Sequence, residues 1–205
     1  MIYKKEPGTS NPSFGVYIQA TNGKCYTKNE WGEVSGLTPN GIAVITDNCR
    51  FVMALACIEN KQIYNNSSVV PNLTSKPGTN TSYSDYSGKS NTDILIQSYG
   101  SSSTYAAGAC VNYVFPNGNK GYIGSHGEWA AFYNNRAGIV DLYNLLGSSI
   151  FSFGGNWWTS TYCGLDGSEV YFHVAGIDSG RYLNINNDIR IITHSSTDII
   201  PFTTI

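Results

Sequence analysis

The chain of 205 residues is long enough to bury a hydrophobic core in one domain or a small pair of domains, and 41% of its residues are hydrophobic. Its net charge of −2 gives no electrostatic reason to expect a nucleic-acid partner. No apolar run reaches membrane-spanning length, so insertion into a membrane is not expected.

Residues 14–57 are typical of antiparallel β-structure. Two short apolar runs flank Thr21-Asn22-Gly23, and Asn-Gly is a strong hairpin signal. Two further runs flank Asp47-Asn48. We therefore expect residues 1–58 to form a small antiparallel β unit that serves assembly or attachment, because no catalytic pattern is visible in it. Its apolar strands have little length in which to bury themselves, which predicts a homo-oligomer.

The start of the chain has two lysines but no apolar segment after them, so neither a signal peptide nor a lipoprotein-type signal is visible. With Met1 as the native start, ordinary secretion is not indicated.

Residues 59–89 are dominated by Asn, Ser, Thr, Pro and Gly, which predicts a long loop or linker. Four N-x-S/T triplets in this stretch are explained by its composition rather than by glycosylation. They begin at Asn65, Asn66, Asn72 and Asn80.

Residues 90–205 open with signals for two short helices. Ser90 and Asp93 have capping-box spacing before an apolar segment, and Gly100 is a plausible end for that helix. The sequence "STYAAGACVNY" is compatible with a second short helix.

The clearest helix is predicted over residues 128–146. Ser125 and Glu128 fit a capping box, and Gly147 fits a helix end. Aromatic and aliphatic side chains fall near one face, which indicates core packing rather than a cofactor site. We expect Trp129 in this helix, and Trp158 after it, to be buried.

Strands are expected after residue 168. Val170, Phe172 and Val174 alternate with Glu169, Tyr171 and His173, and a similar alternation runs over residues 182–186. A period of two places the apolar set against the core and the polar set on the opposite, solvent-facing surface.

The residues that could ligate metals show no metal-binding spacing. The five cysteines form no CxxC pair and predict free thiols, mostly buried, although a Cys49–Cys57 disulfide is compatible with the sequence. No acidic cluster offers the six to eight oxygen ligands of Ca²⁺. Neither a metal nor another cofactor is therefore expected. The other three cysteines are Cys25, Cys110 and Cys163, and the three histidines are His126, His173 and His194.

Five short motifs occur in a characteristic order along the second half of the chain. They are Gly121-Tyr122-Ile123-Gly124, Gly127-Glu128-Trp129, Asn134-Asn135, Trp158-Thr159-Ser160-Thr161 and Ile189-Arg190. In this order the motifs resemble C-type-lectin-like variable proteins of Bacteroidales and their phages, many of which are similar to targets of diversity-generating retroelements. The resemblance implies an α+β fold, with a C-type-lectin-like ligand-display domain over residues 90–205 after the small antiparallel β unit.

The resemblance also implies a ligand-binding surface after the Trp-Thr-Ser-Thr motif, where a retroelement can diversify codons in this family. Ser, Asn and Asp adapt their hydrogen bonds, while Tyr supplies rigid contact area. The candidate ligand-binding residues are Tyr162, Asp166, Ser168, Tyr171, His173, Asp178, Tyr182, Asn184, Asn186 and Asn187.

The function implied by the resemblance is binding rather than catalysis. We expect a homotrimeric phage virion protein, a head- or tail-fibre component or decoration protein, at the virion surface. It would attach to a bacterial cell-surface glycan or protein and contact other virion proteins through its N-terminal unit. The alternative is a bacterial surface or secreted adhesin of the same fold. A formylglycine-generating-enzyme-like oxidase is a remote third reading, because Cys163 has no visible partner cysteine.

Overall fold

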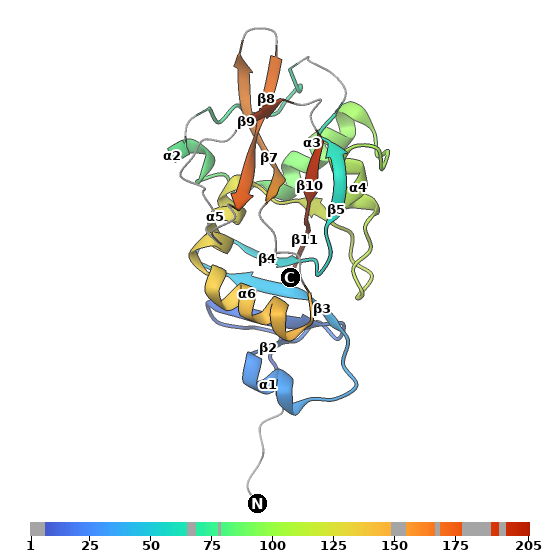
Figure 1. Cartoon of the computed structure of the whole chain (residues 1–205), viewed down its shortest axis with the longest axis vertical. Coiled ribbons are helices and arrows are strands. Elements are labelled where there is room, and N and C mark those ends of the chain that lie inside the picture. The colour runs from blue at the N-terminus through green and yellow to red at the C-terminus, as the bar shows by residue number, and fades with distance from the viewer. Residues whose placement is uncertain are drawn as a thin grey trace, which may run out of the picture.

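The computed structural model describes residues 7–64, 69–77, 79–148, 155–166, 169–177, 190–192 and 196–205. It is a mixed α+β fold with two sheets, as the sequence predicts (Figure 1). Within the described residues, no helix is long and apolar enough to cross a membrane. All five cysteines are free thiols, so Cys49 and Cys57 form no disulfide.

The first sheet has six antiparallel strands in the order β2-β1-β3-β4-β11-β6. Both predicted hairpins are confirmed: β1 and β2 meet around Asn22-Gly23, where Gly23 has a φ of 79°, and β3 and β4 meet around Asp47-Asn48. The strands are β1 (Gly15–Ala20), β2 (Cys25–Tyr26), β3 (Pro39–Ile45), β4 (Arg50–Met53), β6 (Tyr122–Ile123) and β11 (Pro201–Thr204). A short helix, α1 (Lys28–Glu33), follows β2.

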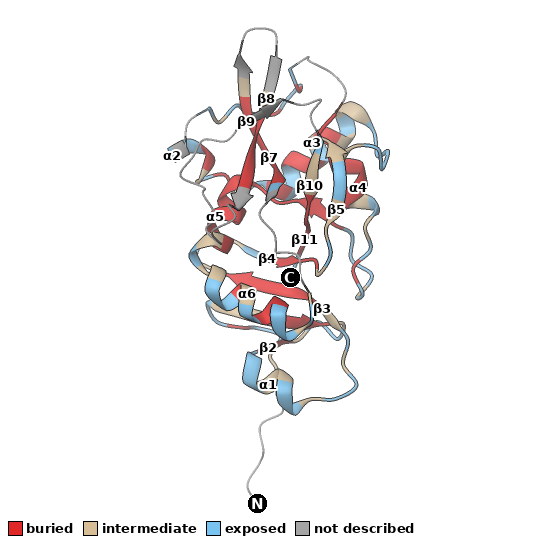
Figure 2. Ribbon diagram, viewed as in Figure 1, coloured by how far each residue is buried: buried red, intermediate tan, exposed pale blue. Residues whose placement is uncertain are grey.

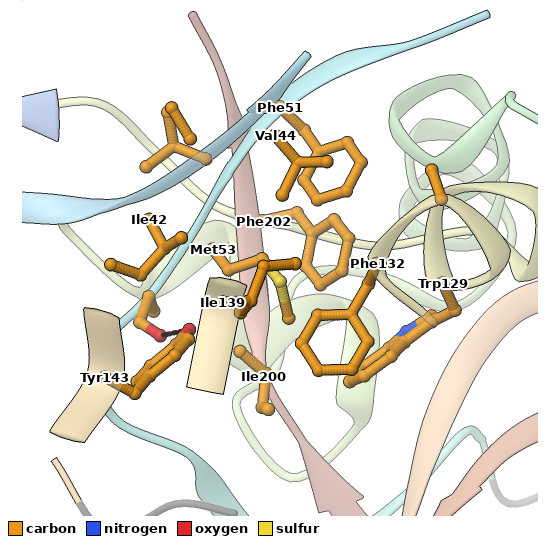
Figure 3. Packing of buried hydrophobic residues seen from close by; sticks show 14 of the residues in the cluster. Ile42, Val44, Phe51, Met53, Trp129, Phe132, Ile139, Tyr143, Ile200 and Phe202 are labelled. Carbon is orange, nitrogen blue, oxygen red and sulfur yellow. Dashed lines mark hydrogen bonds between the residues drawn. The ribbon is translucent and has the colours of Figure 1, made fainter. Parts of the chain in front are cut away.

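This sheet extends across the expected boundary at residue 58. Strand β11 lies beside β4, with Phe202 opposite Met53, and β6 lies beside β11. Figure 3 shows Phe202 in the core among side chains of the first sheet and of the helical region over residues 126–145. Its ring stacks on Phe51 at 4.7 Å and contacts Trp129 at 5.4 Å. The hydrophobic core is therefore shared between the first 58 residues and the second half of the chain.

The single helix expected over residues 128–146 is wrong, because two helices meet at Asn135. They are α5 (His126–Asn134) and α6 (Arg136–Leu145). The Asn135 side-chain amide donates to Ala131 O, while its backbone N–H bonds to Phe132 O. A side chain that competes for the i−4 carbonyl ends the α-helical ladder.

Both predicted ends of this helical region are confirmed. Ser125 and Glu128 form a capping box at the start of α5. Gly147, with a φ of 73°, follows α6, and Ser148 N–H donates to Tyr143 O in the pattern of a glycine-terminated helix. Helix α6 lies on one face of the first sheet (Figure 1), and Tyr143 on it donates a hydrogen bond to Ala54 O at 2.6 Å.

The two helices expected after residue 90 are α3 (Gly88–Tyr99) and α4 (Ala106–Asn112). Gly100 ends α3 as predicted, but the predicted cap at Ser90 is wrong, because α3 begins at Gly88 and Ser90 lies inside it. Gly88 packs directly against Glu128 and Ser125, so a tertiary contact fixes the start of this helix.

The second sheet has the strand order β5-β10-β7-β8-β9, in which only β10 and β7 run parallel. Its strands are β5 (Ile58–Gln62), β7 (Gly155–Asp166), β8 (Glu169–Ile177), β9 (Arg190–Ile192) and β10 (Ser196–Ile199). Trp158 and Phe172 lie in the core between this sheet and α3 and α4, and both are fully buried.

The segment over residues 59–89 is packed more closely than a linker. It contributes most of β5 and the short helix α2 (Thr79–Ser82). Ile63, Tyr64 and Val70 are buried in the core of the second sheet. Its last two residues begin α3, and the remaining described stretches of this segment form loops.

Candidate functional site

Strands β7 and β8 form a long antiparallel hairpin that carries most of the predicted site residues found in the described part of the chain. The ladder runs from Gly155 opposite Ile177 to Asp166 opposite Glu169, with irregular register around Tyr162. Figure 1 shows the end of β7 and the start of β8 at the end of the molecule opposite to α1. Figure 2 shows that the middle of the hairpin is buried, over residues 157–163 and 172–175.

Two of the candidate ligand-binding residues are buried. His173 is 0% exposed, so the expectation that its side chain faces solvent is wrong, and Tyr162 is 4% exposed. Tyr162 packs against Phe172 at 5.6 Å, because the irregular register turns it toward the core. Phe172 and Val174 are buried as predicted, and Tyr171 is half-buried.

The other predicted residues can be placed only in part. Asp166 ends β7, but its side chain is outside the described part of the structure. Ser168, Asp178, Tyr182, Asn184, Asn186 and Asn187 lie outside the described residues. Their role in ligand binding stays a prediction.

His173 is covered by a loop that the sequence did not associate with the hairpin. Residues 75–77, which we call the anchoring segment, run beside β7 and β8. His173 Nε2 donates to Lys76 O at 2.7 Å, since a carbonyl oxygen can only accept. Lys76 N–H donates to Tyr162 O at 2.8 Å, and Ser75 Oγ donates to Cys163 O at 2.6 Å. The anchoring segment thus holds both strands of the hairpin.

A cluster of buried polar side chains lies behind the same part of the hairpin. We call it the polar cluster; it comprises Ser82, Asp85, Asn91, His126, Thr161 and His173, all at most 8% exposed. Asp85 Oδ2 accepts from Thr161 Oγ1 at 2.7 Å and from Asn91 Nδ2 at 3.0 Å. Thr161 Oγ1 in turn accepts from His126 N–H at 2.8 Å. These bonds connect β7 to α3 and to the start of α5.

The two described histidines stack inside the polar cluster. The imidazole rings of His126 and His173 lie 4.9 Å apart and within 17° of parallel. A hydrogen bond of 2.8 Å links His126 Nδ1 to Ser82 Oγ. In some enzymes a hydroxyl group acts as a nucleophile and a neighbouring imidazole acts as its base. Ser82 and His126, however, are at most 1% exposed. Their geometry therefore supports packing of the hairpin rather than attack on a substrate.

Glu128 is a buried carboxyl group next to the polar cluster. Its oxygens accept from Ser125 N–H at 2.7 Å, Ser125 Oγ at 3.0 Å and Tyr122 Oη at 2.8 Å. Burial raises the pKa of Glu128 to about 7, although these hydrogen bonds act in the opposite direction. Glu128 completes the capping box that orients α5, and α5 carries His126.

The described residues contain no group of three or more His, Cys, Asp or Glu side chains placed to hold a metal ion. Cys163, the residue considered for oxidase chemistry, is a buried free thiol 3.9 Å from Pro77 O.

Sequence reasoning predicted a strand over residues 169–174 but missed its pairing with β7, the anchoring segment and the polar cluster. Ser75, Lys76 and Asp85 lie in a stretch whose composition indicates a loop, and no local pattern connects them to residues 161–173. Comparison with models of protein families, with curated proteins and with solved structures finds no match for this chain.

Proposed function

We propose that this chain is a non-enzymatic binding protein with a C-type-lectin-like display domain. In this proposal it is a phage virion protein, a fibre component or decoration protein, that attaches to the surface of a bacterial host. The observation that carries the proposal is the β7–β8 hairpin, whose middle is fixed by the polar cluster and whose end lies opposite to α1.

A hairpin that is fixed along its middle suits binding at its end. The polar side chains beside this middle part are used in internal hydrogen bonds: Asp85 bonds to Thr161 and Asn91, and His173 bonds to the anchoring segment. Residues held by such bonds position the hairpin without contacting a ligand. The fold should therefore tolerate substitutions nearer the end of the hairpin, because the contacts that hold the hairpin lie elsewhere. Preorganised surfaces of this kind lose less conformational entropy on binding.

The opposite end of the molecule suits attachment. The first sheet and α1 lie away from the end of the hairpin, so assembly through this sheet leaves the hairpin accessible (Figure 1). A trimer joined there would present three hairpins in one direction, and repeated weak sites gain avidity. We extend the proposal to a homotrimer that contacts other virion proteins through the first sheet.

Cell attachment of tyrosine variants tests the proposal. Labelled protein is titrated onto intact cells of several Bacteroidales species, and the half-saturating concentration is measured. We expect the double variant Tyr171→Ala, Tyr182→Ala to weaken attachment by about tenfold or more, because aromatic anchors dominate many interfaces.

The matched control is Tyr105→Ala, which removes a half-buried tyrosine just before α4, outside both the hairpin and the first sheet. It should attach like the unmodified chain. Attachment that is unchanged in the double variant, or that falls equally in both variants, would refute display by the hairpin. Failure of the unmodified chain to attach to any of the cells would refute attachment to this class of host.

A further inference from the structure

A second candidate ligand site lies outside the hairpin, where α5 ends and α6 begins. The break at Asn135 leaves a groove of about 530 Å³ against β1, which we call the α5–α6 groove. Its volume falls within the range of small-molecule sites, roughly 300–1,000 Å³. The groove is lined by Val16, Asn134, Asn135, Arg136, Ala137, Gly138 and Val140.

Among the described residues, Arg136 is the one charged residue that lines the groove, and its guanidinium rests on an aromatic ring rather than on a carboxylate. The guanidinium carbon lies 4.6 Å from the centroid of the Tyr133 ring, and Nη1 makes one long hydrogen bond of 3.5 Å to Tyr133 O. No carboxylate of the described residues lies within ion-pair distance of it. Stacking on a tyrosine fixes the plane of the group while most of its N–H donors remain available.

The other lining residues offer neutral hydrogen-bonding groups beside apolar surface. The Asn135 amide is oriented by its bond to Ala131 O at 2.8 Å, which leaves its oxygen as an acceptor. Asn134 is exposed at the end of α5. Val16 and Val140 provide the apolar wall, and Gly138 lines the groove beside Val16.

Together these groups match one class of small ligand. A planar guanidinium pairs with a carboxylate through two parallel hydrogen bonds. Amides exchange hydrogen bonds with hydroxyl groups, and valine side chains contact the C–H face of a sugar ring. A sugar that carries a carboxylate offers all three partners within the size of the groove.

We propose that the α5–α6 groove binds an acidic sugar, with Arg136 as the residue that recognises its carboxylate. This site is separate from the β7–β8 hairpin, so it goes beyond display by the hairpin and does not depend on it.

The test compares two sugars that differ at C6, where one carries a carboxylate and the other a neutral hydroxymethyl group. Methyl glucuronide and methyl glucoside are titrated into the full chain at millimolar concentrations, and binding is followed by amide chemical shifts. We expect methyl glucuronide to bind about tenfold more tightly, and Arg136→Gln to remove this preference, because hydrogen bonds between charged groups carry it. Arg50→Gln, an exposed arginine in β4, is the matched control and should retain the preference.

A second variant keeps the test decisive if Arg136→Gln alters the local fold. Asn134→Asp adds a carboxylate at an exposed lining position and should weaken binding of methyl glucuronide more than binding of methyl glucoside. The variant Tyr171→Ala should bind methyl glucuronide as the unmodified chain does, so the two proposals can fail separately.

Four outcomes would overturn the proposal. They are equal binding of the two sugars, undiminished binding in Arg136→Gln, equal binding of acetate and methyl glucuronide, and absence of binding by the unmodified chain. Equal binding of acetate would mean that the groove takes small anions without recognising the sugar.

Discussion

Replacing Glu128 by Gln should change how the stability of the fold depends on pH. Glu128 is 5% exposed and lies at the start of α5, where Ser125 and Tyr122 donate to its carboxylate. Gln has the same shape, and its amide can accept from Ser125 and donate to Tyr122 Oη. The substitution therefore removes a titratable proton while it preserves the hydrogen-bonded arrangement.

The direction follows from the raised pKa. Burial raises the pKa of Glu128 from an ordinary 4.5 to about 7, so between these values the folded chain holds a proton that the unfolded chain has released. Stability contributed by this group is therefore complete below pH 4.5 and is lost as the pH rises through about 7. At about 1.4 kcal/mol per pKa unit, the loss is at most about 3 kcal/mol.

Urea denaturation at about pH 5 and about pH 8 measures the effect as a difference between proteins. The free energy of unfolding of Glu128→Gln, relative to the unmodified chain, should rise by up to about 3 kcal/mol between these pH values. Groups that titrate in both proteins cancel in this comparison. The matched control is Glu30→Gln in the exposed capping box of α1, where no comparable rise is expected. A difference that does not change with pH would refute the argument that burial destabilises the Glu128 carboxylate.

Three further predictions concern packing and assembly. Phe172→Ala should lower the free energy of unfolding by about 3–5 kcal/mol, measured by urea denaturation, because the ring is fully buried in the core of the second sheet; a loss below about 1 kcal/mol would contradict this position. Gly88→Ala should destabilise the chain by about 1–3 kcal/mol although alanine favours helices, since its Cβ would clash with Glu128 and Ser125. Thermal melts measure the stability of both glycine variants. Gly138→Ala in α6, whose Cβ would lie 4.0 Å from Val16, is the control and should be neutral or stabilising. Light scattering at micromolar concentration should give the mass of a trimer, and a monodisperse monomer would exclude assembly through the first sheet.

Sequence patterns predicted those parts of the fold that depend on neighbouring residues. The capping box of Ser125 and Glu128 and the helix end at Gly147 are local, and both occur where expected. The burial of Trp129 and Trp158 was also predicted, because large aromatic side chains in strongly patterned elements seldom remain exposed.

Features that depend on distant contacts were not predictable in this way. Alternation placed His173 on a solvent-facing surface, but the anchoring segment, about a hundred residues earlier in the chain, covers it. The break at Asn135 arises from one side-chain hydrogen bond inside an otherwise continuous helical pattern. Tertiary packing overrides a local periodicity when another segment buries the face that the pattern leaves polar.

The position of β11 has a consequence for the order in which the chain can fold. Strands β1 to β4 are synthesised early, yet β4 pairs on one side with β11, about 150 residues later in the sequence. During synthesis, the edge of β4 remains unpaired and Phe51 lacks its stacking partner until residues 201–204 have emerged. Such long-range pairing slows folding and leaves an exposed strand edge available to other chains in the meantime. Newly made molecules would thus be most prone to aggregate just before the first sheet closes.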